Sequence, residues 1–431
     1  MGIFKGAFNL AAGGYTAAKA GKAIANMHQA EMQNPGIHAD QFGDSAFYKA
    51  IYGRSDEAQL RAAIYEALTV QRLTTQENPV AIRAITPKSW GKSVEIDLMR
   101  TGKTIMDYDE RRDALAGALG AHNATFGPGS RPGRIIMHLQ HQDPLTQDRG
   151  QWPVLDHGYW RIFWPIPFGV CEDGSTAEVD LWQSSILLGG LPGSGKSVAA
   201  SELIAAAALD PSVDLRLCDP KRVELGLFRD RADAFATEFE QTVEILNRTL
   251  ADIERRYRWL EEYKLRKIEP HHAPVFPAIV LVLDELAEIT ALGTKESKAA
   301  AEKLRRIVAL GRAASVTVIS GTQKPSADVV PTNLRDLFGT RWGGFCGSFG
   351  QAEVIVGSDV AMELTRIPAN QPGTGLLLAE TGQYQKCRSW YLSDADIAAI
   401  VAMATPARKR WLAENSSPWN QVEDSTHNNN E

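Results

Sequence analysis

The sequence predicts an α/β protein built around a large, mostly parallel sheet. Three segments, 184–190 (SSILLGG), 278–286 (AIVLVLDEL) and 315–323 (SVTVISGTQ), are apolar nearly throughout and lack the alternation of a strand with one solvent-exposed face. Segment 213–219 (VDLRLCD) adds another strand, and helical patterns separate these segments. Buried strands that alternate with helices are typical of a parallel sheet covered by helices on both faces.

The helices and later strands of this domain follow the same alternation. A helix is expected over 197–210, a long polar helix over 234–267, and another through 303–312. Segments 340–348 and 374–380 supply edge or later strands. One short helix is expected after Leu392, followed by a polar tail.

Ahead of this domain we expect a small α+β module. Within the N-terminal region, Leu60, Ile64 and Leu68 follow the spacing of a helix. Segment 167–181 is predicted to form a hairpin that turns at Asp173-Gly174. Within the module, segment 110–121 has the pattern of a helix. Three segments have the pattern of strands: 81–87, 92–99 and 134–140. The expected organisation is a helical N-terminal region (1–80), the α+β module (81–164), the α/β domain (165–400) and a polar tail (401–431).

Composition limits the class of protein. The 431 residues are 44% hydrophobic and 23% charged, which is typical of a globular protein without a long membrane span. The net charge of −6 gives no electrostatic footprint for nucleic acid over the whole molecule, so any DNA contact needs a local basic surface. The four cysteines form no CxxC pair and are interpreted as reduced thiols. We expect a cytoplasmic protein, with segment 3–25 as a solvated helix or one that touches a membrane surface.

Residues 190–197 (GLPGSGKS) match the spacing of a phosphate-binding loop between a strand and a helix. Glycines let successive N–H groups face phosphates, and the N-terminus of the next helix adds positive potential. Lys196 is expected to reach the β- and γ-phosphates, and the Ser197 hydroxyl to bind Mg²⁺. The predicted nucleotide-binding residues are Gly190, Pro192, Gly193, Ser194, Gly195, Lys196, Ser197 and Val198.

Asp284-Glu285 ends the apolar strand 278–286. Two carboxylates are costly there unless a cation or a water molecule needs them. We expect Asp284 to hold Mg²⁺ through its waters and Glu285 to orient and deprotonate the attacking water. A pair that only caps the next helix is the alternative, which the loop at 190–197 disfavours.

Thr322 and Gln323 follow the third apolar strand and reach the same carboxyl edge of the sheet, where such folds bind ligands. Gln323 is a candidate contact for the γ-phosphate or its attacking water. On local features alone, a glutamine in a surface turn is an equally good interpretation.

Four further segments, with the loop at 190–197, resemble motifs of the FtsK/SpoIIIE family of DNA translocases. The resemblance spans about residues 165 to 395, with the motifs in the family's order. Residues 167–174 and the module before them are similar to the actinobacterial plasmid-transfer and mobile-element members. The four segments are 217–228 (LCDPKRVELGLF), 253–270 (IERRYRWLEEYKLRKIEP), 281–289 (LVLDELAEI) and 309–330 (ALGRAASVTVISGTQKPSADVV).

The resemblance implies a RecA-like P-loop NTPase that uses ATP and Mg²⁺ and forms a hexameric ring around double-stranded DNA. A neighbouring subunit then supplies an arginine finger, a role that falls first to Arg341 and second to Arg312. Such a finger accelerates hydrolysis by ~10³-fold or more. The chain departs from the family in having Lys324 after Gln323 where arginine is usual. We also expect neither the multi-span membrane domain of the division proteins nor a winged-helix DNA reader.

Two other functions compete with DNA translocation. One is a ring ATPase that moves protein or single-stranded nucleic acid, which a single P-loop module disfavours. The other is a nucleotide-gated, replication-associated scaffold, against which Glu285 argues. The N-terminal region is a candidate contact with a membrane surface or a transfer apparatus.

Overall fold

The computed structural model describes residues 57–75, 78, 80–88, 90–98 and 101–415. The chain divides into two compact units. The smaller unit comprises residues 1–147 and 172–174, and the larger unit comprises residues 148–171 and 175–431. Segment 3–25, the rest of the N-terminal region up to residue 56 and the tail from 416 lie outside the described residues. No helix in the described ranges is long and apolar enough to cross a membrane.

Within the described ranges, the smaller unit is an antiparallel sheet with three helices. Its strand order is β1-β2-β4-β3, and the core contains the predicted helical residues Leu60, Ile64 and Leu68. The predicted strands are confirmed, whereas β3 was missed because a glycine and a proline interrupt its short alternation. The elements are α4 (Glu57–Val70), β1 (Ala81–Lys88), β2 (Gly91–Asp97), α5 (Ile105–Asp109), α6 (Arg112–Ala118), β3 (Asn123–Pro128) and β4 (Arg134–Gln140).

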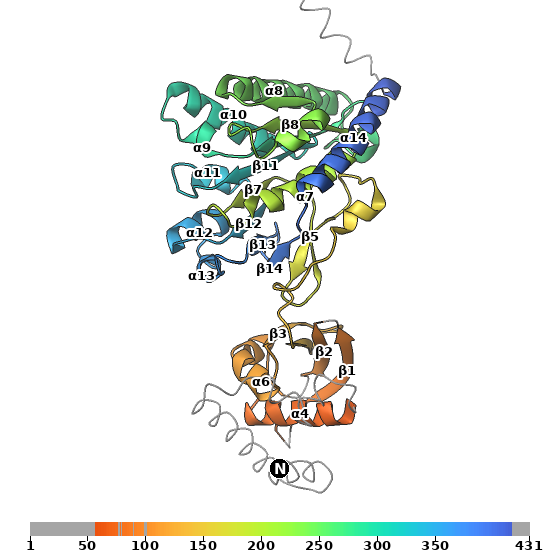
Figure 1. Cartoon of the computed structure of the whole chain (residues 1–431), viewed down its shortest axis with the longest axis vertical. Helices are drawn as coiled ribbons and strands as arrows, with labels where there is room; N and C mark the ends of the chain where they lie inside the picture. The colour runs from red at the N-terminus through yellow and green to blue at the C-terminus, as the bar shows by residue number, and fades with distance from the viewer. Residues whose placement is uncertain (1–56, 76–77, 79, 89, 99–100, 416–431) are drawn as a thin grey trace, which may run out of the picture. The chain divides into compact units, whose positions relative to one another are not determined.

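The larger unit contains a ten-stranded sheet in the order β6-β5-β14-β13-β12-β7-β11-β10-β8-β9 (Figure 1). The strands from β12 to β9 run parallel, and those from β13 to β6 pair antiparallel. The predicted mostly parallel sheet is confirmed, as is the β5–β6 hairpin. The strands are β5 (Ile166–Cys171), β6 (Thr176–Val179), β7 (Ile186–Gly189), β8 (Val213–Cys218), β9 (Ala234–Ala236), β10 (Ala278–Leu283), β11 (Val316–Thr322), β12 (Thr340–Gly344), β13 (Thr374–Leu378) and β14 (Tyr384–Ser389).

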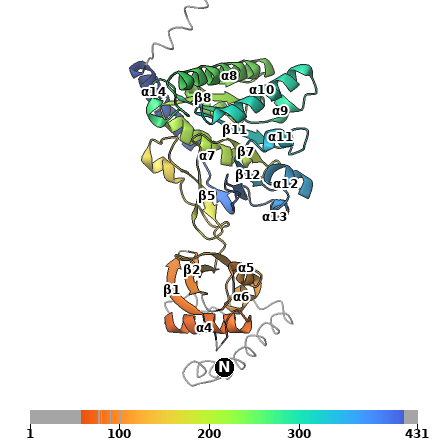
Figure 2. The ribbon, with the colours of Figure 1, turned by 180° about the vertical axis from the view of Figure 1, so that it is seen from behind.

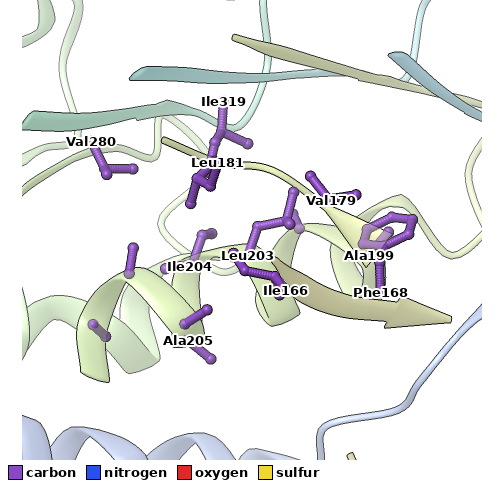
Figure 3. Close-up of a cluster of buried hydrophobic side chains, with 14 of the residues drawn as sticks. Ile166, Phe168, Val179, Leu181, Ala199, Leu203, Ile204, Ala205, Val280 and Ile319 are labelled. Carbon is purple, nitrogen blue, oxygen red and sulfur yellow. The ribbon is translucent and has the colours of Figure 1, made fainter. Parts of the chain in front are cut away.

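Helices cover both faces of this sheet, which is why its central strands are apolar on both sides. Ile186 and Leu188 of β7 pack into the core beneath α7 and α14, whereas Leu187 packs into the core beneath α8 and α10. Figure 2 shows α8 and α10 side by side, and Figure 3 shows side chains of α7 against those of β5 and the central strands. The helices are α7 (Lys196–Leu209), α8 (Phe239–Glu262), α9 (Ala287–Thr290), α10 (Lys295–Gly311), α11 (Thr332–Arg335), α12 (Phe349–Val356), α13 (Ala361–Thr365) and α14 (Asp394–Glu414), with short 3₁₀ turns at Pro153–His157, Gly226–Arg231 and Pro270–His272.

The predicted helix over 234–267 was too long at both ends. Residues 234–236 form β9 beside β8. Helix α8 begins after its N-cap residue Glu238, whose backbone N–H donates to the Gln241 side chain. At the other end, Lys264 has a positive φ of 55°, which a right-handed helix cannot contain.

The predicted boundary at residue 401 is also wrong, because the last helix continues to Glu414 through Pro406. Arg408 holds this second half in place by donating to Asp233 (2.9 Å) and to the Pro211 carbonyl (2.9 Å). Segment 340–348, expected at an edge or later in the sheet, contains β12, which lies in the interior between β7 and β13.

Candidate active site

The predicted phosphate-binding loop joins β7 to α7. Lys196 is the first residue of α7, so the N-terminal N–H groups of a 14-residue helix face the loop. Gly195 has a φ of 94°, and a Cβ there would lie 2.1 Å from the Gly373 backbone nitrogen, so only glycine fits. Two backbone bonds fix the loop: Leu191 N–H donates to the Phe345 carbonyl (3.0 Å), and Gly373 N–H to the Ser194 carbonyl (2.9 Å).

Lys196 and Asp284 form a buried ion pair at the carboxyl edge of the sheet. The Lys196 ammonium lies 2.7 Å from Asp284 Oδ1 and 2.9 Å from the Asp284 carbonyl oxygen, and both side chains are 3% exposed. The structure thus brings together the loop lysine and the strand-end aspartate, which lie 88 residues apart in the chain.

Gly321 of β11 makes this approach possible, and the sequence analysis missed it. A Cβ at Gly321 would lie 2.4 Å from the Asp284 carbonyl oxygen and 2.9 Å from the Lys196 Nζ. The signal in the sequence was a glycine inside a predicted strand, which can mark a close approach by another group.

The residues around Asp284 fit a magnesium ion. Asp284 Oδ2 is buried and accepts no hydrogen bond from the described residues, so one carboxylate oxygen is left to bind a cation or its water. Ser197, in the first turn of α7, supplies a hydroxyl. Mg²⁺ in nucleotide sites is typically held by one or two protein oxygens with phosphates and waters, so no group of three ligands is needed. The described ranges contain no such group.

Glu285 is nearly buried, and three nitrogens hold its carboxylate. Oε2 accepts from the Gln323 backbone N–H (3.1 Å) and from Lys221 Nζ (3.4 Å), and Oε1 accepts from the Ala287 backbone N–H (3.4 Å). Gln323 therefore reaches Glu285 through its main chain, whereas the predicted role concerned its half-buried side chain. That role stays a prediction.

The segment Asp219-Pro220-Lys221 lies beside Glu285 because β8 and β10 are neighbours, with Cys218 opposite Leu283. Asp219 is fully buried, and its Oδ2 accepts from the Leu225 backbone N–H (2.9 Å), which closes a turn over 219–225. This segment belongs to the predicted motif 217–228, for which the sequence indicated no chemical role.

Neither candidate finger residue joins this cluster within its own chain. Arg341 lies on β12 opposite Leu187 of β7, two residues before Gly343, which is opposite Gly189. Its Nη1 lies 3.5 Å from the Ile355 carbonyl oxygen. Burial lowers the pKa of Arg341. Arg312 is exposed and forms an ion pair with Glu380 (3.0 Å). A finger acts across a subunit boundary, so both assignments stay predictions.

The fold and the loop–strand arrangement define a RecA-like P-loop NTPase. Residues 160–276 match the model of the FtsK/SpoIIIE family.

Several curated relatives carry the description DNA translocase FtsK. The protein from Borreliella burgdorferi is 29% identical over 229 residues, which cover 49% of this chain and 29% of that protein. The protein from Treponema pallidum is 32% identical over 186 residues, which cover 39% of this chain and 23% of that protein. The chain thus matches less than a third of the length of either relative.

Among solved structures, the chain resembles the monomer form of the pCW3 conjugation coupling protein TcpA with ATPγS. The match has a TM-score of 0.53 at 17% identity and covers 80% of this chain and 99% of that one. At this identity the likeness concerns the fold alone.

Proposed function

We propose that this protein hydrolyses ATP to move double-stranded DNA, acting as a homo-oligomeric ring with a hexamer as the expected form. The observation that carries the ATPase part is the buried Lys196–Asp284 pair with Glu285 beside it, at the edge of the sheet where the phosphate-binding loop begins α7. Lysine, aspartate and glutamate in this arrangement are what phosphoryl transfer to water requires.

Each group has a separate task in this proposal. The loop N–H groups and the α7 N-terminus bind the phosphates, and Lys196 offsets negative charge on the β- and γ-phosphates. Ser197 and Asp284 would hold Mg²⁺, which supplies further neutralisation of phosphate charge. Glu285 accepts a proton from the attacking water, and Gln323 positions that water.

The ring completes the site. We assign the finger to Arg341 first and to Arg312 second, each acting on the nucleotide of the adjacent subunit.

Duplex DNA as the cargo is supported by the relatives described as DNA translocases. The structural neighbour TcpA is a conjugation coupling protein, which motivates a role in conjugal transfer or segregation of a mobile element. A chain of net charge −6 needs a local basic surface for this, which ring assembly would concentrate at the pore. We place the protein in the cytoplasm, with the N-terminal region as its contact with a membrane surface or a transfer apparatus.

Displacement of a triplex-forming strand tests the cargo. A short third strand is bound to a long duplex, and its release is followed with ATP, with the non-hydrolysed analogue ATPγS, and with a Lys196→Ala variant. We expect release only for the wild-type protein with ATP. ATP hydrolysis without release, or equal release with ATPγS, would contradict translocation along duplex DNA.

A further inference from the structure

Lys221 contacts the carboxylate assigned above as the general base. Its Nζ lies 3.4 Å from Glu285 Oε2, the oxygen that also accepts the Gln323 backbone N–H. The other two donors to Glu285 are backbone N–H groups of Gln323 and Ala287, fixed at the end of β11 and the start of α9. Lys221 is thus the donor that a side-chain rotation can withdraw, and its side chain is 38% exposed.

We propose that Lys221 is a positioning residue that holds the Glu285 carboxylate toward the 219–225 turn and thereby restrains ATP hydrolysis until that turn moves. This inference rests on the proposed ATPase activity of the same site. An oxygen that accepts from both an ammonium and a backbone N–H is directed at those donors. A general base, by contrast, must direct a lone pair at the attacking water.

The 219–225 turn is anchored in the core at both ends, whereas its middle lies at the surface. Asp219 is buried and bonded to the Leu225 N–H, and Leu225 is 3% exposed, so both ends are anchored. Between them, Arg222 has a positive φ of 62°, which a non-glycine residue adopts at a cost, and Val223 is 74% exposed. A surface that presses on this tip would shift Lys221 without disturbing β8.

Lys221 does not duplicate Lys196. The Lys196 ammonium is 3% exposed and contacts Asp284 on the side of the phosphate-binding loop. Lys221 reaches Glu285 from the β8 side of β10. If Lys221 instead bound the phosphates, its removal would slow hydrolysis, so the sign of the change separates the two roles.

Three variants test the proposal through ATP turnover measured without nucleic acid. Lys221→Met keeps the length and removes the charge, Lys221→Arg keeps the charge, and Arg222→Met removes a charge from the same turn. Arg222 pairs with Glu238, so it is a matched control. Since the released ion pair is partly exposed on the lysine side, we expect Lys221→Met to raise kcat about two- to fivefold with KM for ATP unchanged. Lys221→Arg and Arg222→Met should keep the wild-type kcat.

Two results would overturn the proposal. If kcat of Lys221→Met falls or does not change, Lys221 does not restrain hydrolysis. An equal rise in Arg222→Met, which leaves the Lys221–Glu285 pair in place, would show that the gain does not come from that pair. Adding Glu285→Gln to Lys221→Met should abolish the gain. A wild-type protein without any ATP turnover would contradict the proposed function. The restraint is judged by a different quantity, the ratio of kcat in the variant to kcat in the wild type.

Discussion

Two buried charge clusters of the larger unit, one around Arg216 and one at Lys196–Asp284, differ in how completely they are paired. Arg216 of β8 is 1% exposed, and each of its three side-chain nitrogens donates to a neighbour: to Asp214, Asp252 and Thr249. The Lys196–Asp284 pair is as deeply buried, yet Asp284 Oδ2 accepts no bond from the described residues. Burial of charge is common to both clusters, and an unpaired oxygen distinguishes the one at the sheet edge.

The electrostatics of the Arg216 cluster match a structural role. Burial alone would lower the pKa of Arg216, but the carboxylates of Asp214 and Asp252 outweigh that effect and raise it. Such a cluster has no remaining capacity for a ligand. The comparison therefore assigns stability to Arg216 and chemistry to Asp284, and the following substitutions probe that division.

The largest effect is expected from Arg216→Met. The change leaves Asp214 and Asp252 buried without their cation, which typically costs about 3–5 kcal/mol of unfolding free energy. Urea unfolding measures the loss, with Arg305→Met as control, because the Arg305–Glu302 pair lies on the surface and should leave the midpoint unchanged. Equal midpoints for Arg216→Met and wild type would refute the structural assignment.

Gly321→Ala, by contrast, should lower the rate of ATP hydrolysis and have a smaller effect on stability. The added methyl group displaces the Asp284 carbonyl and the Lys196 ammonium, and misplacement of catalytic groups by ~1 Å can cost about 10²-fold in rate. Steady-state ATP turnover measures it against Gly226→Ala, since a Cβ at Gly226 meets nothing within 4 Å. If both variants keep wild-type turnover, the close approach at β11 has no catalytic importance.

A smaller, pH-dependent effect is expected at Glu202, a buried acid on α7. Burial raises its pKa well above the ordinary value of 4.5, against the opposing influence of the Arg149 guanidinium. The folded chain then keeps a proton that the unfolded chain loses. The stability contributed by Glu202 is therefore present below about pH 4.5 and is lost as pH rises toward the folded-state pKa.

Glu202→Gln removes this dependence. Above about pH 4.5, the variant should gain on the wild type by about 1.4 kcal/mol per pH unit for as long as the folded wild-type protein keeps its proton. Urea unfolding at several pH values measures the difference between the two. A difference that does not change with pH would mean that Glu202 has a similar pKa in the folded and unfolded chains.

The parts of the site that the sequence predicted are those with fixed local spacing. Lys196 and Ser197 follow from the loop pattern, and Asp284-Glu285 follows from two carboxylates at the end of an apolar strand. Gly321 and Lys221 were not predicted, because their contacts depend on which strands are neighbours: β11 beside β10, and β8 beside β10 on its other side.

The fold shows the same limit. The buried strands and their parallel arrangement followed from apolar runs separated by helices, whereas the limits of α8 depend on β9 and on a single positive φ at Lys264. Similarly, Arg216 lies in the middle of a predicted strand, but its partner Asp252 is 36 residues away on α8, and no local pattern identifies it.

The most direct test of the account is ATP turnover by the wild-type protein and by Glu285→Gln, each with long duplex DNA, with single-stranded DNA and without nucleic acid. The account predicts strong stimulation of the wild-type protein by duplex DNA alone, and no turnover by Glu285→Gln under any condition. Wild-type turnover indifferent to nucleic acid would contradict the proposed cargo, and turnover retained in Glu285→Gln would contradict the role assigned to the carboxylate at the edge of the sheet.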